Sequence, residues 1–155
     1  MIISDILRLE GIEVDLKSQT KEDVLIELVD LLEQAKMLDE NKEIIRNAIF
    51  EREKLSSTGI CDGLAIPHAK VSGIKSILGG IGISKQGIDF QALDKKVSKI
   101  FFILISPKED HGNHVKALAK ITKILKEESW REELMRCPGP QEVLDFIKDK
   151  EKNLV

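Results

Sequence analysis

The apolar positions in the first third of the chain recur at helical spacing. Between Thr20 and Ala35 they return at intervals of about three and four residues, which places them along one face of an α-helix. Thr20 stands before Asp23 at the spacing of a helix N-cap. A second helix is expected to begin after Asp39 and to run toward Lys54. The apolar residues of the two expected faces are Val24, Leu25, Leu28, Val29, Leu32 and Ala35, and then Ile44, Ile45, Ala48 and Ile49.

The middle of the chain changes to a pattern typical of β-strands. Residues 77–84 and 99–106 are runs of β-branched and other apolar side chains, bounded by glycine, by residues 85–87 and by Pro107. Residues 12–16 alternate between apolar and polar positions, which predicts a further short strand.

The helical period returns after the second of these runs. Ser129 and Glu132 have the spacing of a capping box for a further helix, which Pro138 is expected to end. Pro140 suits the first position of a last helix. Since helices precede and follow the central strands, the pattern predicts an α/β sandwich, a single domain over residues 1–155. The residues expected on the buried face of the helix before Ser129 are Val115, Leu118, Ala119, Thr122 and Leu125, joined by Ile121 and Ile124.

Composition excludes several classes of function. The 155 residues carry a formal net charge of −3, and no basic run alternates with aromatic residues, so nucleic acid is not an expected partner. The longest wholly apolar run, residues 100–105, is far shorter than a membrane span, and the first residues lack the features of a secretion signal. Cys61 and Cys137 match no disulfide framework and no C-x-x-C motif. We therefore expect a cytoplasmic protein that does not insert into a membrane.

The candidate chemistry centres on one histidine, His68, which directly follows Pro67 at the end of a short apolar run. Proline fixes its own φ, biases Ile66 toward extended geometry and cannot donate to a strand ladder. This run is therefore expected at a sheet edge or a strand end. The imidazole would be held on a stiff, exposed strand terminus, and a neutral imidazole can carry a covalent phosphoryl group. Taken alone, a single histidine is more often structural or merely exposed.

The segment around His68 is one of several that follow a recognisable order and spacing. These segments are Arg52-Glu53, Ser57-Thr58-Gly59-Ile60, Gly63-Leu64-Ala65-Ile66-Pro67-His68, Gly87-Ile88-Asp89-Phe90, Ala92-Leu93-Asp94, and His114 with Leu118. In this order, from about Ser4 to Lys148, the chain resembles the type 2 enzyme IIA domains of the bacterial phosphotransferase system, the fructose, mannitol and nitrogen-regulatory class. The resemblance implies a mixed β-sheet flanked by helices on both sides, and a phosphotransferase that works through a phosphohistidine.

The resemblance also implies a role for each candidate residue. His68 would accept a phosphoryl group from the carrier protein HPr and pass it to a cysteine or histidine of a IIB domain. Arg52 and His114 would stabilise the charge that develops during transfer, and no metal or bound cofactor is implied. A polar loop around the phosphoryl site would offer hydroxyl and amide donors. Its residues are Ser57, Thr58, Gly59 and Pro67.

The same side chains also allow structural interpretations. His114 would simply begin a buried helix face, and Arg52 closes a helix whose C-terminal dipole stabilises any cation. His111 lies in a polar turn, where a solvated histidine is ordinary, and we interpret it as a bystander. A zinc site made of Cys61 and the three histidines has no common ligand spacing and stays the less favoured alternative. Residues 79–82 are glycine-rich, but a strand follows them, which argues against nucleotide binding.

Two residues of the His68 segment depart from the family pattern. Cys61 and Asp62 stand where such domains more often have glycine and asparagine. A carboxylate that points at a phosphorylated histidine would oppose it electrostatically, so the position of Asp62 bears directly on the hypothesis.

Two functions fit the resemblance. One is a relay for coupled sugar uptake and phosphorylation, and we favour the fructose type because residues 87–94 and the His68 segment are both compatible with it. The alternative is a nitrogen-regulatory type of protein, which would bind target proteins according to its phosphorylation state. Both functions need the same chemistry at His68.

Overall fold

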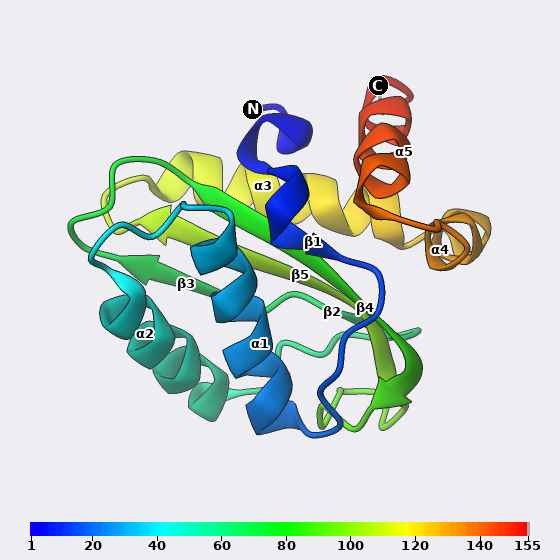
Figure 1. Ribbon diagram of the computed structural model, residues 1–155, viewed down its shortest axis with the longest axis horizontal. Helices are drawn as coiled ribbons and strands as arrows, with labels where there is room; N and C mark the ends of the chain where they lie inside the picture. The colour runs from blue at the N-terminus through cyan, green and yellow to red at the C-terminus, as the bar shows by residue number, and fades with distance from the viewer. Residues whose placement is uncertain (155) are drawn as a thin grey trace.

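The computed structural model, which describes residues 1–154, places a mixed five-stranded sheet between two layers of helices (Figure 1). The order across the sheet is β1 (Ile12–Glu13), β4 (Leu78–Ile88) and β5 (Ser98–Pro107), and then β2 (Leu64–Ala65) and β3 (His68–Val71), which both pair with β5. The β4–β5 pair is antiparallel and the other pairs are parallel. The predicted α/β fold with a mixed sheet covered by helices is thus confirmed.

One face of the sheet is covered by α1 (Lys21–Gln34) and α2 (Lys42–Leu55). The predicted N-cap of α1 is present, since Thr20 Oγ1 accepts a hydrogen bond from the Asp23 N–H at 3.2 Å. Alternate residues of β5 point into this layer because successive side chains of a strand face opposite ways. They are Phe101, Ile103 and Ile105.

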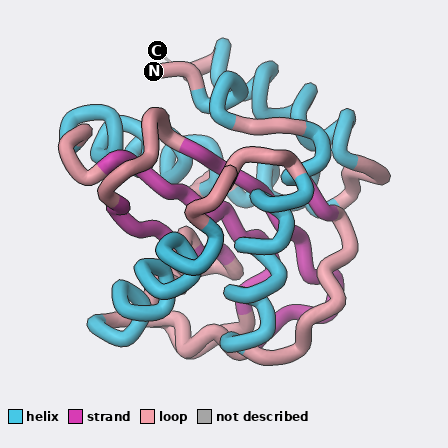
Figure 2. Tube along the Cα trace, turned by 60° about the vertical axis from the view of Figure 1, so that its left-hand side comes forward, coloured by secondary structure: helices cyan, strands magenta, loops and turns pink. Residues whose placement is uncertain are grey.

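The other face is covered by the two ends of the chain. The 3₁₀ turns η1 (Ile3–Ile6) and η2 (Leu9–Gly11) lie there beside α3 (His111–Leu125), α4 (Glu128–Met135) and α5 (Pro140–Lys152). Figure 2 shows both termini at the same end of the molecule, above this layer. Pro140 takes the first position of α5, as predicted. The residues of β5 that point into this layer are Ile100, Phe102 and Leu104.

The glycines at 79–82 belong to the interior of β4 and serve close packing. A Cβ at Gly82 would lie 2.8 Å from the side chain of Leu16, and one at Gly80 would lie 3.0 Å from the carbonyl oxygen of Gly11. Larger residues would push the N-terminal segment off the sheet. The rejection of a nucleotide-binding loop agrees with this role, because the glycines precede no helix.

The predicted buried face of α3 is confirmed at Ile121, Ile124 and Leu125, with Leu118 partly buried, and is wrong at its other positions. Val115 is 63% exposed, and Ala119 and Thr122 are exposed as well. A helix rotates by about 100° per residue, so burial of His114 turns the next residue outward. The side chains that α3 buries are His114, Ala117, Ile121, Ile124 and Leu125.

Two boundaries also differ from the predictions. α4 begins at Glu128 behind the N-cap Glu127, which makes no side-chain capping bond, so Ser129 lies inside the first turn and the predicted capping box is wrong. In β1, only Ile12–Glu13 pairs with β4, although the Leu16 N–H still bonds to the Ile83 carbonyl at 2.9 Å. Local spacing alone does not tell where the neighbouring strand stops pairing.

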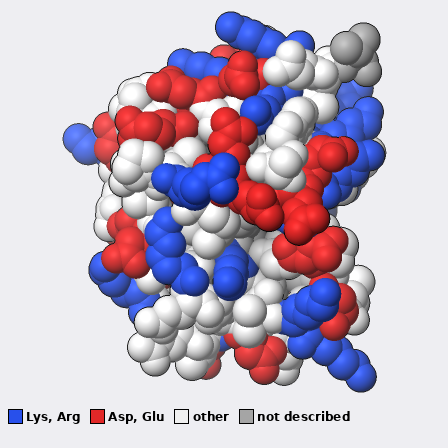
Figure 3. All heavy atoms as spheres, turned by 90° about the vertical axis from the view of Figure 1, so that its right-hand side faces the viewer, with Lys and Arg blue, Asp and Glu red and all other residues white. Residues whose placement is uncertain are grey.

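The surface over α4 and α5 mixes the two signs of charge. Figure 3, which faces this side, shows Lys and Arg interspersed with Asp and Glu, in keeping with a net charge of −3. In residues 1–154, no helix combines the length and the apolar character that crossing a membrane requires.

Candidate active site

The edge of the sheet carries His68. β2 and β3 follow one another along the same side of β5 in unbroken register, with Ala65 opposite Phe101 and His68 opposite Leu104. Pro67 lies between the two strands, and its carbonyl accepts a hydrogen bond from the Leu104 N–H at 2.9 Å. β2 and β3 form the edge of the sheet beside β5, and Pro67, which has no N–H to donate to the ladder, stands at the break between these two strands. The proline therefore stands at a sheet edge, where the sequence placed it.

The imidazole of His68 is fixed in one tautomer. Its Nδ1–H donates to the carbonyl oxygen of Ile66 at 2.7 Å, and because a carbonyl can only accept, the proton must sit on Nδ1. The lone pair of the ring therefore lies on Nε2. Burial lowers the pKa of His68, and the positive charges of Arg52 and Lys70 lower it further. The ring is thus a neutral nucleophile near pH 7.

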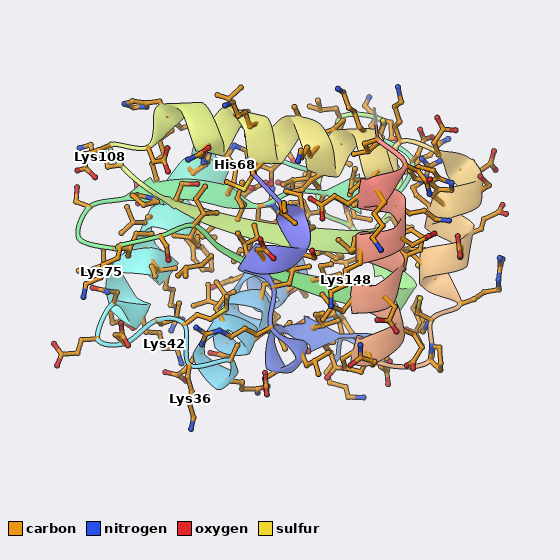
Figure 4. The ribbon with its side chains drawn as sticks, turned by 90° about the horizontal axis from the view of Figure 1, so that it is seen from above. Lys36, Lys42, His68, Lys75, Lys108 and Lys148 are labelled. Atoms are coloured by element: carbon orange, nitrogen blue, oxygen red, sulfur yellow. The ribbon has the colours of Figure 1, made fainter. Side chains whose placement is uncertain are left out.

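A second imidazole lies beside the first. His114, in the first turns of α3, has its ring centroid 5.5 Å from that of His68, and Figure 4 shows His68 close under this helix. Nδ1 of His114 and the hydroxyl of Ser106 are 2.6 Å apart. Burial is the main cause that lowers the pKa of His114 to about 4, and repulsion from Lys70 and from His68, when that ring is protonated, adds to it. Two neutral rings therefore face each other at neutral pH.

A second contact, between Lys70 and His111, joins the same strand and helix as the two rings. Lys70 follows His68 by two residues in β3 and so projects from the same face of the sheet, while His111 precedes His114 by one turn of α3. The ammonium of Lys70 donates to Nδ1 of His111 at 2.9 Å. His111 is therefore tied to the edge of the site rather than solvated alone, as the bystander interpretation assumed.

Arg52 stands in the last turn of α2. Its Nη1 donates to the carbonyl of Ser56 at 3.0 Å, so it does satisfy a helix end, as the structural interpretation held. Its charge also reaches the site, since it is one cause of the lowered pKa of His68. The guanidinium is only partly buried, which leaves it donors for an incoming anion.

A buried carboxylate organises the turn that follows α2. Glu53 is 7% exposed and accepts hydrogen bonds from the Thr58 N–H at 2.8 Å and from Thr58 Oγ1 at 2.6 Å. The ammonium of Lys21, in α1, forms an ion pair with Glu53 Oε1 at 3.0 Å and also lies over the ring of Phe90. These partners compensate the loss of hydration that a buried carboxylate suffers.

The hydroxyl groups of the turn are engaged inside it. Ser57 Oγ donates to the carbonyl of Phe90 at 3.0 Å and accepts from the Gly59 N–H at 3.0 Å. A Cβ at Gly59 would lie 2.9 Å from Ala92, so the turn packs closely on the next loop. In the structure the hydroxyl groups of Ser57 and Thr58 and the Gly59 N–H are bonded within the turn, and their expected role as donors to the phosphoryl group stays a prediction.

Asp62 is not among the groups with the largest effects on the pKa of His68. It has a φ of 54°, and its N–H donates to Asp94 Oδ2 at 2.9 Å. Its carboxylate acts on the neighbouring Cys61, whose pKa burial raises first and Asp62 second. The largest charge effects on the pKa of His68 come instead from Arg52, Glu53 and Lys70.

The zinc alternative finds no support in the geometry. Among residues 1–154, no three His, Cys, Asp or Glu side chains are grouped as metal ligands. Nδ1 of His68 is bonded to Ile66. Nδ1 of His114 is bonded to Ser106.

Sequence reasoning missed three residues that touch the candidate site. Alternation along β3 could have placed Lys70 beside His68. Glu53 directly follows Arg52, and a carboxylate at a helix end beside a Ser-Thr-Gly turn is a capping signal. Ser106 gave no signal, because its contact with His114 depends on how α3 packs over the end of β5.

Burial of His114 predicts a pH dependence of stability. Its pKa is about 4 when folded and near 6.5 when unfolded, so the unfolded chain binds more protons between these values. Stability contributed by the neutral ring should therefore be complete above pH 6.5 and decline as the pH falls toward 4, by up to about 3 kcal/mol. Urea unfolding at a series of pH values, with His114→Gln as the reference that cannot titrate, measures this change. Parallel curves for the two proteins would contradict it.

A family model described as "Phosphoenolpyruvate-dependent sugar phosphotransferase system, EIIA 2" matches residues 5–150. The fructose-specific EIIA component of Haloferax volcanii is 32% identical over 147 residues, which are 95% of each chain. The fructose-specific EIIABC component of Bacillus subtilis is 31% identical over 98% of this chain but over only 24% of its own length. The chain therefore spans about a quarter of that relative.

Solved structures agree with the sequence relatives. The crystal structure of the nitrogen regulatory protein IIA-Ntr of Neisseria meningitidis is 32% identical, with a TM-score of 0.86 over 94% of this chain and 98% of that one. The mannitol IIA of Escherichia coli, solved in complex with phosphorylated enzyme IIB, shares the fold at 19% identity, with a TM-score of 0.78 over 92% and 97%. Relatives of both the fructose and the nitrogen-regulatory type thus match nearly all of the sequence, and the chain belongs to the type 2 EIIA family of the phosphotransferase system.

Proposed function

We propose that the protein is a phosphocarrier that accepts a phosphoryl group on Nε2 of His68. The observation that carries the proposal is the hydrogen bond from Nδ1–H to the Ile66 carbonyl, because it leaves the other nitrogen free with its lone pair. The donor is phosphohistidine of HPr, and residues 1–155 act as one IIA domain in the cytoplasm. Membership of the EIIA family supports this relay.

In the transfer, the lone pair of His68 Nε2 attacks the phosphorus in line. A new N–P bond forms while the N–P bond of phospho-HPr breaks, and its electron pair returns to the imidazole of HPr. No oxidant, metal or net proton change is needed, because the phosphoryl group arrives activated. The Nδ1–H bond to Ile66 stabilises the positive charge that develops on the ring of His68.

His114 and Arg52 stabilise the phosphoryl group without carrying it. A loose phosphoryl transition state spreads charge over its peripheral oxygens, so donors placed around it lower the barrier. His114 lies beside His68, and the positive charge of Arg52 already acts on that ring. A guanidinium can also bind two phosphoryl oxygens at once.

Partner docking uses apolar side chains that surround the site. They are Leu55 (82% exposed), Leu93 (72%) and Val115 (63%). Val115 is next to His114, Leu55 lies one turn beyond Arg52, and the Leu93 N–H bonds to the Gly59 carbonyl at 3.0 Å. An apolar centre with a charged rim suits a transient interface.

Two functions remain, and they differ in the protein that the phosphorylated form acts on. We favour a IIB domain of a fructose-type sugar permease, because the relatives from Haloferax volcanii and Bacillus subtilis are fructose-specific components. The alternative is regulation of a target protein by phosphorylation state, which the likeness to the nitrogen regulatory protein of Neisseria meningitidis supports.

His68→Ala should abolish phosphorylation. With phosphoenolpyruvate, enzyme I and HPr, the wild-type protein is expected to gain one acid-labile phosphoryl group and the variant none. His111→Ala is the matched control, since it removes a histidine of the same region that carries no phosphoryl group. Label on His68→Ala would refute the assignment.

His114→Ala and Arg52→Ala should remain able to accept the group but transfer it slowly. The loss of one stabilising donor typically costs about 3 kcal/mol of barrier, or about a hundredfold in rate. Single-turnover transfer measures the effect, with Arg46→Ala as a control on the same helix as Arg52. Rates equal to the wild type in both variants would reduce the two residues to structural roles.

The choice between transport and regulation is tested with the phosphorylated protein. It is offered purified IIB domains of the fructose, mannitol and galactitol classes. Rapid, selective loss of label to the fructose-class domain is the expected result. Retention of label against every IIB domain, together with a target protein that binds only one phosphorylation state, would establish regulation instead.

A further inference from the structure

One wholly buried serine contacts the second imidazole of the candidate site. Ser106 is 0% exposed, and its Oγ lies 2.6 Å from Nδ1 of His114. We propose that Ser106 is a positioning residue: its hydroxyl donates to Nδ1 of His114 and so keeps the ring proton on Nε2, ready to donate to the phosphoryl group on His68. This inference rests on the proposed function and deepens it.

The sheet register brings Ser106 to this position. In the parallel pairing of β3 with β5, Lys70 lies opposite Ser106 as His68 lies opposite Leu104. Paired residues project from the same face of a sheet, so Ser106 shares the face of the two β3 side chains. β5 ends one residue later and α3 begins shortly afterwards, which sets Ser106 against the first turns that carry His114.

Only one placement of the protons gives both the Ser106 hydroxyl and Nδ1 of His114 a hydrogen-bond partner. A buried hydroxyl needs an acceptor for its proton, and within residues 1–154 the contact with His114 is the only side-chain hydrogen bond of Ser106. If Nδ1 carried a proton, the serine would accept it and its own proton would have no partner. Donation from Ser106 to the Nδ1 lone pair satisfies both groups. The pKa of His114, about 4, agrees, since the ring is then not doubly protonated at neutral pH.

The two imidazoles therefore hold opposite tautomers for opposite tasks. A carbonyl, that of Ile66, fixes the proton of His68 on Nδ1 and leaves Nε2 as a nucleophile. A hydroxyl, that of Ser106, fixes the proton of His114 on Nε2, which makes that nitrogen a donor. The nitrogens of an imidazole point in nearly opposite directions, so the donor lies on the edge away from Ser106. In the other tautomer, His114 would turn a lone pair toward the phosphoryl oxygens and repel them.

Nitrogen NMR of the unphosphorylated protein tests the tautomer directly. Long-range proton–nitrogen correlations at pH 7 show which nitrogen of each ring carries the proton. We expect Nε2–H for His114 and Nδ1–H for His68 in the wild type. Ser106→Ala should populate the other tautomer of His114 and leave His68 unchanged. Ser98→Ala is the matched control, because Ser98 is a second wholly buried serine of β5, on the same face, whose hydroxyl has no partner in the described chain.

Transfer kinetics test the consequence. Ser106→Ala should slow onward transfer about tenfold, since the donor remains but is no longer oriented, whereas Ser98→Ala should leave the rate unchanged. Ser106→Thr, which keeps a hydroxyl, should restore most of the rate. In a His114→Ala background, Ser106→Ala should add no further loss, because a residue that acts through His114 has nothing left to orient. His114→Gln, which retains a donor near the position of Nε2, should transfer faster than His114→Asn.

Several results would overturn the inference. An Nδ1–H tautomer of His114 in the wild type, or a tautomer that Ser106→Ala leaves unaltered, would contradict it even if phosphoryl transfer is normal. So would a further loss of rate from Ser106→Ala in the His114→Ala protein. A wild-type protein that accepts no phosphoryl group would instead refute the proposed function, and the NMR measurement would still decide whether Ser106 sets the tautomer.

Discussion

The parallel pairing of β3 with β5 determines where the candidate residues of the site lie. It fixes His68 opposite Leu104 and Lys70 opposite Ser106, and β5 then leads directly into α3. Because the side chains of both strands alternate, this single register puts two β3 side chains and Ser106 on the face that α3 covers. A slip of one residue would turn His68 toward the layer of α1 and α2 and separate it from His114. Pro67 restricts the backbone next to His68, whereas the register determines which side chains surround the imidazole.

The site also shows how burial and charge are balanced. Two imidazoles lie close together, and burial with the charge of Lys70 lowers the pKa of both rings, while Arg52 also lowers that of His68. An excess of positive charge around a neutral nucleophile attracts a phosphoryl group without protonating the nitrogen that must attack it. The acidic group that raises the pKa of His68 is Glu53, and its carboxylate is already bound by Thr58 and by Lys21. The negative charge therefore stabilises the turn and faces the incoming anion only weakly.

What the sequence predicted well is local. The N-cap at Thr20, the proline at the start of α5 and the edge position of Pro67 depend on a few neighbouring residues and the rules of backbone geometry. What it predicted poorly depends on distant partners. The hydroxyl of Ser57 looked available until the carbonyl of Phe90, which follows it by 33 residues, came to lie beside it. Nothing around Ser106 in the sequence marks it either, since its contact with His114 depends on the packing of α3 over the end of β5.

Val115 was the clearest failure of helical periodicity, and the reason bears on function. An apolar residue that faces water one position after a buried histidine contributes nothing to the core, so a packing rule places it wrongly. A phosphocarrier must meet a donor and an acceptor in turn at one nitrogen, which requires a surface that both partners can cover and leave. Exposed apolar side chains can pack against either partner. Charged residues around them distinguish the partners, because they speed the association of a protein of complementary charge and repel one of like charge. Under the proposed function, the transfer chemistry of His68 is common to transport and regulation, and we expect the residues that separate the two functions in the charged rim around Leu55, Leu93 and Val115.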